Sequence, residues 1–347
     1  MSSINRNNFR LNYFNRLIFT INMLVLFIAY CIYLNRVFTP SQIPYFNFIS
    51  IGFPIIFALN LIFVFYWLLV SWRHFLVVLI LSIGIVYPFY LSYPIYNFNK
   101  KSTEVANLTV MTFNPHGFKE DGTKELVENN LADIMLFQEA REPVQKKWSE
   151  NQLKGYYKEY FDLLTIYSKY PIIGTKVIKS SDSTSIGIAA YADIDLGFDT
   201  IRVINLYMHP MQIKKEMVKE VMNSDTTEEI EVSGKLIENK LVNGMKMHEK
   251  QFETLIPFLK NSPHPIILGA DLNSTPESYE YQTLNKYLID SYIQKGEGNG
   301  TTFHGFKFPI RIDYLFHSKG IEVINAKVIR KKFSDHYPLV VSYKIDK

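Results

Sequence analysis

The chain of 347 residues has a single cysteine and, in its first hundred residues, no acidic side chain at all. One cysteine, Cys31, excludes a disulfide within the chain, and by itself it does not distinguish a reducing from an oxidising compartment. The first acid is Glu104, and before Lys100 the only charged residues are five arginines. Internal repeats and low-complexity linkers are also absent from the sequence, which excludes solenoid and disordered classes of protein.

The charge that does occur is unevenly distributed. From Lys100 onward the chain contains 32 of its 37 basic residues and all 33 of its acidic residues, a net charge of −1. The overall charge of +4 therefore belongs to the N-terminal third. A nearly neutral C-terminal part has no global field to attract a polyanion such as duplex DNA. The charge pattern therefore disfavours a processive or non-specific nuclease.

Three uncharged apolar runs, residues 17–34, 46–70 and 75–91, lie in the N-terminal third. About 20 mostly apolar residues are needed for a helix to cross the hydrocarbon core, so these runs predict three transmembrane helices in an anchor of residues 1–99. The alternative for the first run is a signal peptide. Two further apolar runs follow it and no A-x-A-like site ends it, which favours retained helices.

The basic residues around these runs indicate a topology. Cytoplasmic loops carry an excess of Lys and Arg. On the N-terminal side of the membrane would lie four arginines, Arg6, Arg10, Arg16 and Arg73. On the other side would lie three basic residues, Arg36, Lys100 and Lys101. This bias favours a cytoplasmic N-terminus and a C-terminal domain on the extracytoplasmic side.

Residues 100–347 show many short apolar, β-branched runs with helical stretches between them, which predicts a single layered α/β domain. The segment 211–250 interrupts this pattern. Its charged centre, residues 223–233, is expected between two helices. We interpret the segment either as a solvated surface insertion or as a flap over the pocket or a contact with the membrane surface.

Six segments of this domain place polar side chains at the ends of predicted strands. They are TVMTFN with Asn114, IMLFQE with Glu139, RVINLY with Tyr207, ILGADLN with Asp271 and Asn273, RIDYLF with Asp313, and FSDH with Asp335 and His336. Buried strands of this kind deliver side chains to a shared rim. The series as a whole therefore predicts an enzyme active site.

Three of these residues form a candidate metal site. The carboxylate of Glu139 is a natural ligand for Mg²⁺, which takes one or two protein carboxylates and keeps several waters. Asp335 is a second carboxylate on the metal side. Asn114 is expected either to support the metal through its amide oxygen or to hydrogen-bond a carboxylate ligand. Taken singly, Asn114 before Pro115 and Asp335 before His336 would be ordinary turn residues.

The remaining residues suit the chemistry of phosphate esters. Asp271 and Asn273 project to one side of an extended backbone, where Asp271 can align or deprotonate water and Asn273 can donate to a phosphate oxygen. His336 is expected to contact the scissile phosphate as proton donor or oxyanion stabiliser. Asp313 would hold the tautomer of its ring.

The order N…QE…(H/Y)…GDxN…RIDY…SDH resembles the endonuclease/exonuclease/phosphatase superfamily, the DNase I-like proteins, over residues 107–343. The N-terminal helices and the S-x-x-Y at 278–281 resemble membrane-anchored bacterial members, which implies a multi-pass protein of the inner membrane. The resemblance implies a four-layered α/β sandwich of two mixed β-sheets. It also implies a divalent cation, Mg²⁺ with Mn²⁺ as the alternative.

The sequence departs from the family pattern at a few positions. It reads GADLN where GDxN is usual, and Tyr207 stands where many phosphatase-type and DNase-type relatives have His. A phenol can donate to phosphate, but its pKa of about 10 makes it a poor acid or base near neutrality. His116 replaces an Asp of some nucleases. His116, Arg141 and His209 are further candidates for substrate binding. Arg141 is either a phosphate clamp or a salt-bridged helix residue, and His209 is either a substitute for the missing histidine or a surface residue before Pro210.

The sequence thus predicts a membrane-anchored, metal-dependent phosphoesterase in which water attacks a phosphodiester or phosphomonoester in line. Its partners would be the lipid bilayer and a phosphoester, such as a phospholipid headgroup or a phosphorylated metabolite, and nucleic acid is less favoured. A Mg²⁺-dependent nuclease is one alternative, favoured by Tyr207 alone. A catalytically silent, membrane-bound binding protein is the other.

Overall fold

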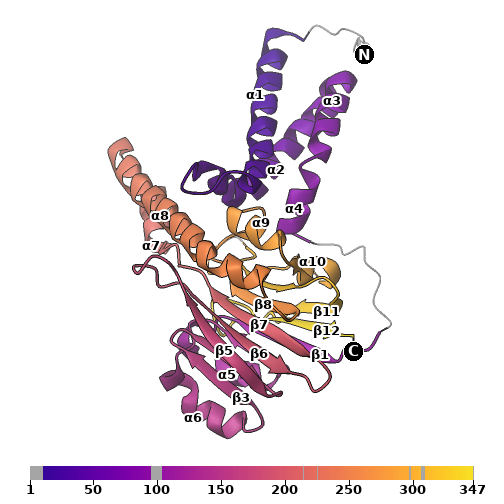
Figure 1. Ribbon diagram of the computed structural model, residues 1–347. Coiled ribbons are helices and arrows are strands. Elements are labelled where there is room, and N and C mark those ends of the chain that lie inside the picture. Colours follow the sequence, from indigo (N-terminus) through magenta and orange to yellow (C-terminus); the bar gives the residue numbers. More distant parts are fainter. Residues whose placement is uncertain are drawn as a thin grey trace.

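An N-terminal group of helices stands on a two-sheet domain in the computed structural model, which describes residues 11–94, 104–213, 215–224, 226–296, 298–305 and 309–346 (Figure 1). Arg6, Arg10, Lys100 and Lys101 lie outside the described residues. The charge bias at these four positions therefore stays a prediction.

The first two predicted membrane helices are present, and the third is broken. Helix α1 (Tyr13–Tyr30) continues into the 3₁₀-helix η1 (Cys31–Arg36), α2 is Tyr45–Val70, and α3 (Trp72–Ile83) and α4 (Val86–Ser92) are bent by 50°. Among the residues that the structure describes, two helices are thus long and apolar enough to cross a membrane, or three if the bent pair forms one span. The hydroxyl groups of Tyr30 and Tyr33 donate to the carbonyls of Leu81 and Gly84. Because side chains satisfy these carbonyls, the helix can break there.

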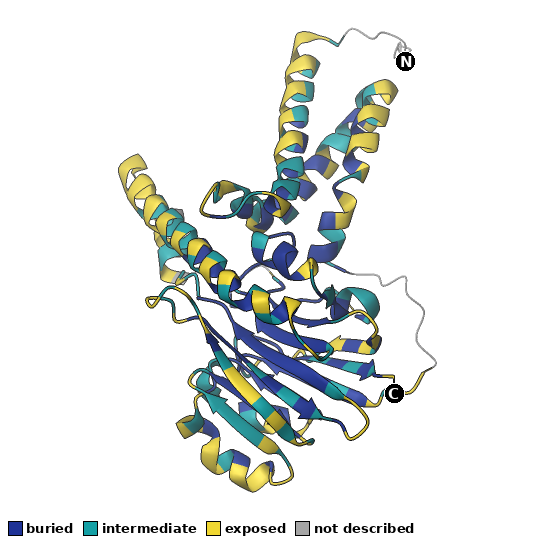
Figure 2. Ribbon diagram, in the orientation of Figure 1, coloured by how far each residue is buried: buried dark blue, intermediate teal, exposed yellow. Residues whose placement is uncertain are grey.

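The outward faces of these helices are apolar. Large side chains such as Leu24, Ile62 and Leu69 are exposed, and Figure 2 shows exposed residues along the outer sides of the helices. Polar groups lie inside instead, where Asn60 contacts Asn22 at 3.4 Å and donates to Ser82 at 2.8 Å. Polar side chains within and apolar ones outside are typical of helices that face lipid.

The domain consists of two six-stranded sheets. Both are mixed, because β1–β2 in one sheet and β7–β8 in the other pair in parallel whereas the other pairs are antiparallel. The first sheet has the order β11 (Glu322–Val328), β12 (Leu339–Lys344), β1 (Leu108–Phe113), β2 (Ile134–Phe137), β4 (Leu164–Ser168) and β3 (Tyr157–Phe161). The second has the order β5 (Ile172–Lys179), β6 (Ile188–Asp195), β7 (Thr200–Tyr207), β8 (Ile266–Asp271), β10 (Asp313–His317) and β9 (Ile289–Asp290).

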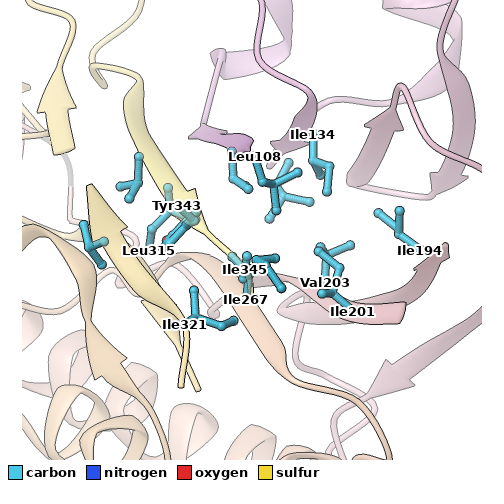
Figure 3. Close-up of a cluster of buried hydrophobic side chains, with 14 of the residues drawn as sticks. Leu108, Ile134, Ile194, Ile201, Val203, Ile267, Leu315, Ile321, Tyr343 and Ile345 are labelled. Carbon is cyan, nitrogen blue, oxygen red and sulfur yellow. The ribbon is translucent and has the colours of Figure 1, made fainter. Parts of the chain in front are cut away.

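Apolar side chains of both sheets meet in one core, shown in Figure 3. Helices α5 (Thr123–Glu128) and α6 (Glu142–Gln152) lie against the outer face of the first sheet. Helices α8 (Thr227–Lys260) and α9 (Tyr279–Asn285) cover the second sheet, and the short helices η2 (His116–Phe118), α7 (Lys215–Asn223) and α10 (Ser291–Lys295) lie in connections. The predicted four-layered α/β sandwich of two mixed sheets is therefore confirmed.

The alternation of side chains along the strands decides which residues reach the space between the sheets. Along β8, Ile266 and Leu268 pack in the outer cluster beneath the helices, whereas Ile267 packs in the core between the sheets. Asp271 has the same parity as Ile267 and therefore points inward at the end of the strand. Gly269 shares this face, where a β-carbon would come within 2.6 Å of Leu136 of the other sheet.

Several elements differ from the sequence prediction. Residues 223–233 were expected to separate two helices, but the segment from Thr227 belongs to α8. The Thr226 side chain accepts from the Glu229 amide at 3.2 Å, a capping contact that begins the helix within this charged stretch. Helices α6 and α10 and strands β3 and β9 were not predicted, because their sequences are short or rich in polar residues.

Asn205 joins the two sheets through hydrogen bonds. Its amide nitrogen donates to the carbonyls of Phe137 at 2.9 Å and Thr165 at 3.0 Å, and its oxygen accepts from Gln138 at 2.6 Å. All of these groups are buried. The contact holds the ends of β2 and β7 together immediately beside Glu139.

We expect Asn205→Ala to destabilise the chain by about 1–3 kcal/mol, because it removes the hydrogen bonds that the buried Phe137 and Thr165 carbonyls and the Gln138 amide make with Asn205. Thermal unfolding of the detergent-solubilised protein measures this loss. Asn325→Ala, the same change at an exposed strand position, serves as control. Equal unfolding midpoints for the two variants would contradict the role of Asn205.

Candidate active site

Three of the predicted site residues lie directly opposite one another on adjacent strands. The register pairs Tyr207 of β7 with Asp271 of β8, and Asp271 with Asp313 of β10. In the other sheet, Phe113 pairs with Phe137, so that Asn114 and Glu139 follow the ends of two parallel neighbours. The carboxyl ends of parallel strands meet at one edge of a sheet. Strand pairing therefore gathers side chains from five separate strands.

His336 lies between two buried aspartates. Its Nδ1 is 2.9 Å from a carboxylate oxygen of Asp313, and its Nε2 is 3.9 Å from Asp271. Burial lowers the pKa of His336, but the charges of Asp313 and Asp271 outweigh this effect and raise it above the ordinary value. Burial raises the pKa of Asp271, and the charge of His336 opposes that shift. The ring is therefore held as a cation, beside a carboxyl group suited to accept a proton.

Glu139 is oriented by two neutral donors. The Asn114 amide donates to Glu139 at 3.1 Å and also to Asp271 at 3.0 Å, and the Tyr207 hydroxyl donates to Glu139 at 2.7 Å. Of the two roles considered for Asn114, the structure thus shows the hydrogen bond to carboxylates. Tyr207 was expected to donate to phosphate, but its single hydroxyl hydrogen is directed at Glu139. Burial raises the pKa of Tyr207, which keeps it a donor.

Asp335 and His116 lie on the same side of the site as Glu139. The Nδ1 atom of His116 is 3.9 Å from a carboxylate oxygen of Glu139 and 3.6 Å from one of Asp335. All three side chains are partly exposed. Glu139 and His116 have positive φ angles of 50° and 47°. Such strain in non-glycine residues is tolerated where a side chain must be held in one direction.

A divalent cation fits the carboxylates of Glu139 and Asp335 better than it fits a second, buried group of three side chains. Asp271, Asp313 and His336 offer ligand atoms within 4.8 Å of one another. The nitrogen of His336 nearest Asp313 is already engaged, however, and Mg²⁺ prefers oxygen ligands together with several waters. Glu139 and Asp335 supply carboxylate oxygens in a partly exposed setting with room for water. Glu139 and Asp335 could therefore hold a cation, and the trio could supply acid–base groups.

A cavity of about 610 Å³ adjoins Glu139 and Tyr207. Most of its wall comes from the segment 179–188, which includes Lys179 and four serines, and Arg141 also lines it. Arg141 pairs with Asp162 at 3.4 Å and is largely exposed. The segment 179–188 was not predicted to belong to the site, because a serine-rich connection has no recognisable spacing.

Two further candidates lie differently from expectation. His209 was considered as a substrate-binding residue, but it is buried behind the site and is not among the residues that line the cavity. Its Nδ1 accepts from the Ile186 amide at 3.3 Å. Asn273 lies at the site, and its amide donates to the Met208 carbonyl at 3.1 Å. This contact uses one of the two hydrogens of the amide.

The fold and the site define a class of protein: an α/β sandwich hydrolase with acidic and histidine side chains gathered at the open end of two sheets. The model of the endonuclease/exonuclease/phosphatase family matches residues 111–336, well over half of the chain, and the chain belongs to this family. A hydrolase of phosphoric ester bonds, the predicted class of enzyme, is confirmed. A second model, a domain of unknown function (DUF8431), matches residues 15–93.

Individual relatives are distant. A UPF0294 protein of Vibrio parahaemolyticus is 26% identical over 103 residues, and one of Vibrio vulnificus is 28% identical over 102 residues. The two matches span 30% and 29% of this chain. They cover 36% and 35% of the length of the curated relatives, about a third of each.

Solved structures share the fold of the C-terminal domain. An endonuclease/exonuclease/phosphatase from Bacteroides vulgatus superposes with a TM-score of 0.52 at 15% identity, covering 69% of this chain and 99% of that chain. A D. rerio TDP2 complexed with a single strand DNA product has a TM-score of 0.50 at 11% identity, covering 68% and 98%. At such identities the likeness shows the fold alone.

We expect Asp313→Asn to lower kcat by on the order of 10²–10⁴-fold, because Asp313 holds the His336 ring and sustains its proton. Steady-state kinetics on the full chain, with thermal unfolding in parallel, separates this loss from misfolding. Asp195→Asn, at the opposite end of the same sheet, is the matched control. A variant at position 313 that keeps wild-type kcat would remove His336 from the acid–base role.

Proposed function

We propose that this protein is a membrane-anchored phosphoesterase in which water attacks the phosphorus of a phosphodiester or phosphomonoester in line. The observation that carries the proposal is the convergence of Glu139, Asp271, Asp313 and His336 from both sheets, with Glu139 also lining an open cavity. Such a set contains an acid, a base and carboxylates for a cation, the components that hydrolysis of a phosphate ester requires. A binding protein without catalysis has no need of this convergence.

Each residue has a distinct part in the proposed reaction. Asp271 accepts the proton of the attacking water, and protonated His336 donates to the oxygen of the departing group. The Asn273 amide donates to a non-bridging phosphate oxygen. Asn114 and Tyr207 hold Glu139 in place.

A divalent cation, Mg²⁺ with Mn²⁺ as the alternative, would be held by Glu139 and Asp335. When bound, it supplies positive charge that polarises the phosphoryl group. The donor set supports this assignment because both side chains offer hard oxygen ligands and neither is fully buried.

The cavity supports a small, polar substrate. Serines, Lys179 and Arg141 offer donors to hydroxyl and phosphate groups, and about 610 Å³ accommodates a headgroup or a phosphorylated metabolite. The nearly neutral domain gives no broad basic surface for a duplex. We therefore favour a phospholipid headgroup or phosphorylated metabolite over nucleic acid.

We further propose that the helices cross a bacterial inner membrane three times, with the domain on the extracytoplasmic side. The η1 helix, the start of α2 and the end of α4 all contact the domain, through Asn35, Asn47 and Leu91. Figure 1 shows the start of α1 at the far end of the helices from the domain. This arrangement needs an odd number of crossings, which the bent α3–α4 pair supplies as the third.

We expect Glu139→Gln to lower metal-dependent turnover by on the order of 10²–10³-fold and EDTA to abolish turnover in the wild type. The purified full chain is offered a short-chain phospholipid, a sugar phosphate, and single-stranded and duplex DNA with fluorescent labels. Glu142→Gln, three residues away on exposed α6, is the matched control. Restoration of turnover by Mg²⁺ or Mn²⁺ after EDTA identifies the cation.

The panel also decides between the alternatives. Selective cleavage of DNA would replace the proposed substrate class with a nuclease. Absence of turnover on every phosphoester, unchanged in Glu139→Gln, would favour a binding protein that uses the fold as a scaffold.

The topology has its own test. A reporter that is active on one side of the membrane only, fused after Lys347, is expected to be active in its extracytoplasmic form. A second fusion after Val70 should report the cytoplasm, since the second crossing ends there. The reverse pattern would place the domain inside the cell.

A further inference from the structure

Buried polar side chains, rather than apolar contacts alone, join the membrane helices to the catalytic domain. Asn47, in the first turn of α2, accepts from the Tyr279 amide at 2.7 Å and donates to both carboxylate oxygens of Glu280, at 3.2 and 2.9 Å. Asn47 is 3% exposed and Glu280 is 0% exposed. A membrane helix thus satisfies the first amide of α9, a helix of the domain, together with a buried carboxylate.

From the Glu280 carboxylate, a series of contacts leads toward the active site. Glu280 contacts His248 Nδ1 at 2.7 Å, and the other ring nitrogen of His248 contacts the His209 carbonyl at 2.6 Å. One turn further along α8, the Gln251 side chain accepts from the His209 amide at 2.8 Å and donates to the Tyr207 carbonyl at 3.2 Å. Two side chains of α8 therefore bind the backbone that carries Tyr207.

A second connection starts from the loop after β8. Asn273 contacts Met208 at one end of this loop, and Glu277 lies at the other end. The Glu277 carbonyl accepts from Asn35 at 3.0 Å, and its carboxylate is 3.6 Å from Arg36. Asn273 and Glu277 both have positive φ angles, 49° and 67°. Non-glycine residues keep such conformations only where their surroundings hold them.

The chemistry of Glu280 makes this connection sensitive to its partners. Burial raises the pKa of Glu280, but hydrogen bonds from His248 and Asn47 outweigh burial and leave it lower than usual. A buried carboxylate that loses a donor must lose its charge or move. Either response would shift His248 and, through it, the His209 carbonyl.

We infer that the membrane helices are a positioning part of the active site, with Asn47 acting through Glu280 and His248 on the backbone at 207–209. This inference rests on the proposed function for its kinetic consequence. Asn47 is a positioning residue and not a catalytic one, since it contacts neither the cavity nor the acid–base trio. The helices consequently do more than tether the domain to a bilayer.

The test compares Asn47→Ala with Asn60→Ala in the full chain. Both changes remove a buried asparagine from α2, but the contacts of Asn60 lie within the helices. We expect Asn47→Ala to lower kcat by on the order of 10-fold with KM unchanged, as for coupling between separate sites. Asn60→Ala should keep wild-type kcat. Equal kcat losses in the two variants, or none at position 47, would overturn the inference.

A charge exchange distinguishes positioning from general damage. Asn47→Asp places a second carboxylate beside Glu280 and should lower kcat more than Asn47→Ala does. Adding Glu280→Gln restores one carboxylate and one amide in exchanged positions, and we expect it to recover most of the lost rate. A double variant with a kcat no higher than that of Asn47→Asp would contradict the connection from Asn47 through Glu280 and His248.

Hydrogen exchange supplies a readout that does not depend on turnover. In Asn47→Ala, the amides of residues 207–209 and 272–278 should exchange faster, whereas Asn60→Ala should leave them protected. If the wild type hydrolyses no phosphoester, the proposed function fails. This comparison still decides whether Asn47 positions the backbone at 207–209. Unchanged protection of both segments would show that the helices do not position the site.

Discussion

The site depends on keeping several carboxylates close together in a largely buried place. Asp271 and Asp313 are almost fully enclosed, and their carboxylate oxygens lie within 4.8 Å of each other. Like charges this close repel strongly where water is scarce. The His336 ring between them offsets that repulsion, and the single amide of Asn114 bridges Asp271 to Glu139. Because these groups stabilise one another, the loss of one partner leaves a buried charge without compensation.

This electrostatic requirement explains the architecture around the site. The residues come from both sheets, so the sheets must keep a constant separation at their open end. Asn205 and Gln138 join them by hydrogen bonds there, and Gly269 permits their close approach. The long helix α8 then holds the end of β7 from behind, and the membrane helices contact the same layer through Asn47. Stability and active-site geometry thus depend on the same contacts.

The sequence predicted strand ends well and side-chain partners less well. β1 and β2 end where the sequence predicts, because apolar, β-branched runs end abruptly at Asn114 and Gln138. Helix α6 was missed because its polar residues show little apolar periodicity. The hydroxyl group of Tyr207, expected to donate to phosphate, donates to Glu139 in the structure, because a carboxylate lies within its reach. The surface alternative for His209 was wrong: a histidine before a proline resembles a surface turn, but α8 covers this one.

The sequence by itself determined the family, the layered α/β class, the apolar N-terminal helices and the set of acids, amides and histidine available for chemistry. These follow from local patterns, because apolar periodicity and the residue at a strand end are properties of a few neighbouring positions. Only the tertiary structure decided that Asn114 bridges two carboxylates, that the segment 179–188 walls the cavity, and that Asn47 reaches Glu280. Each of these pairs residues far apart in the chain, and their distance depends on the packing of layers rather than on any local sequence.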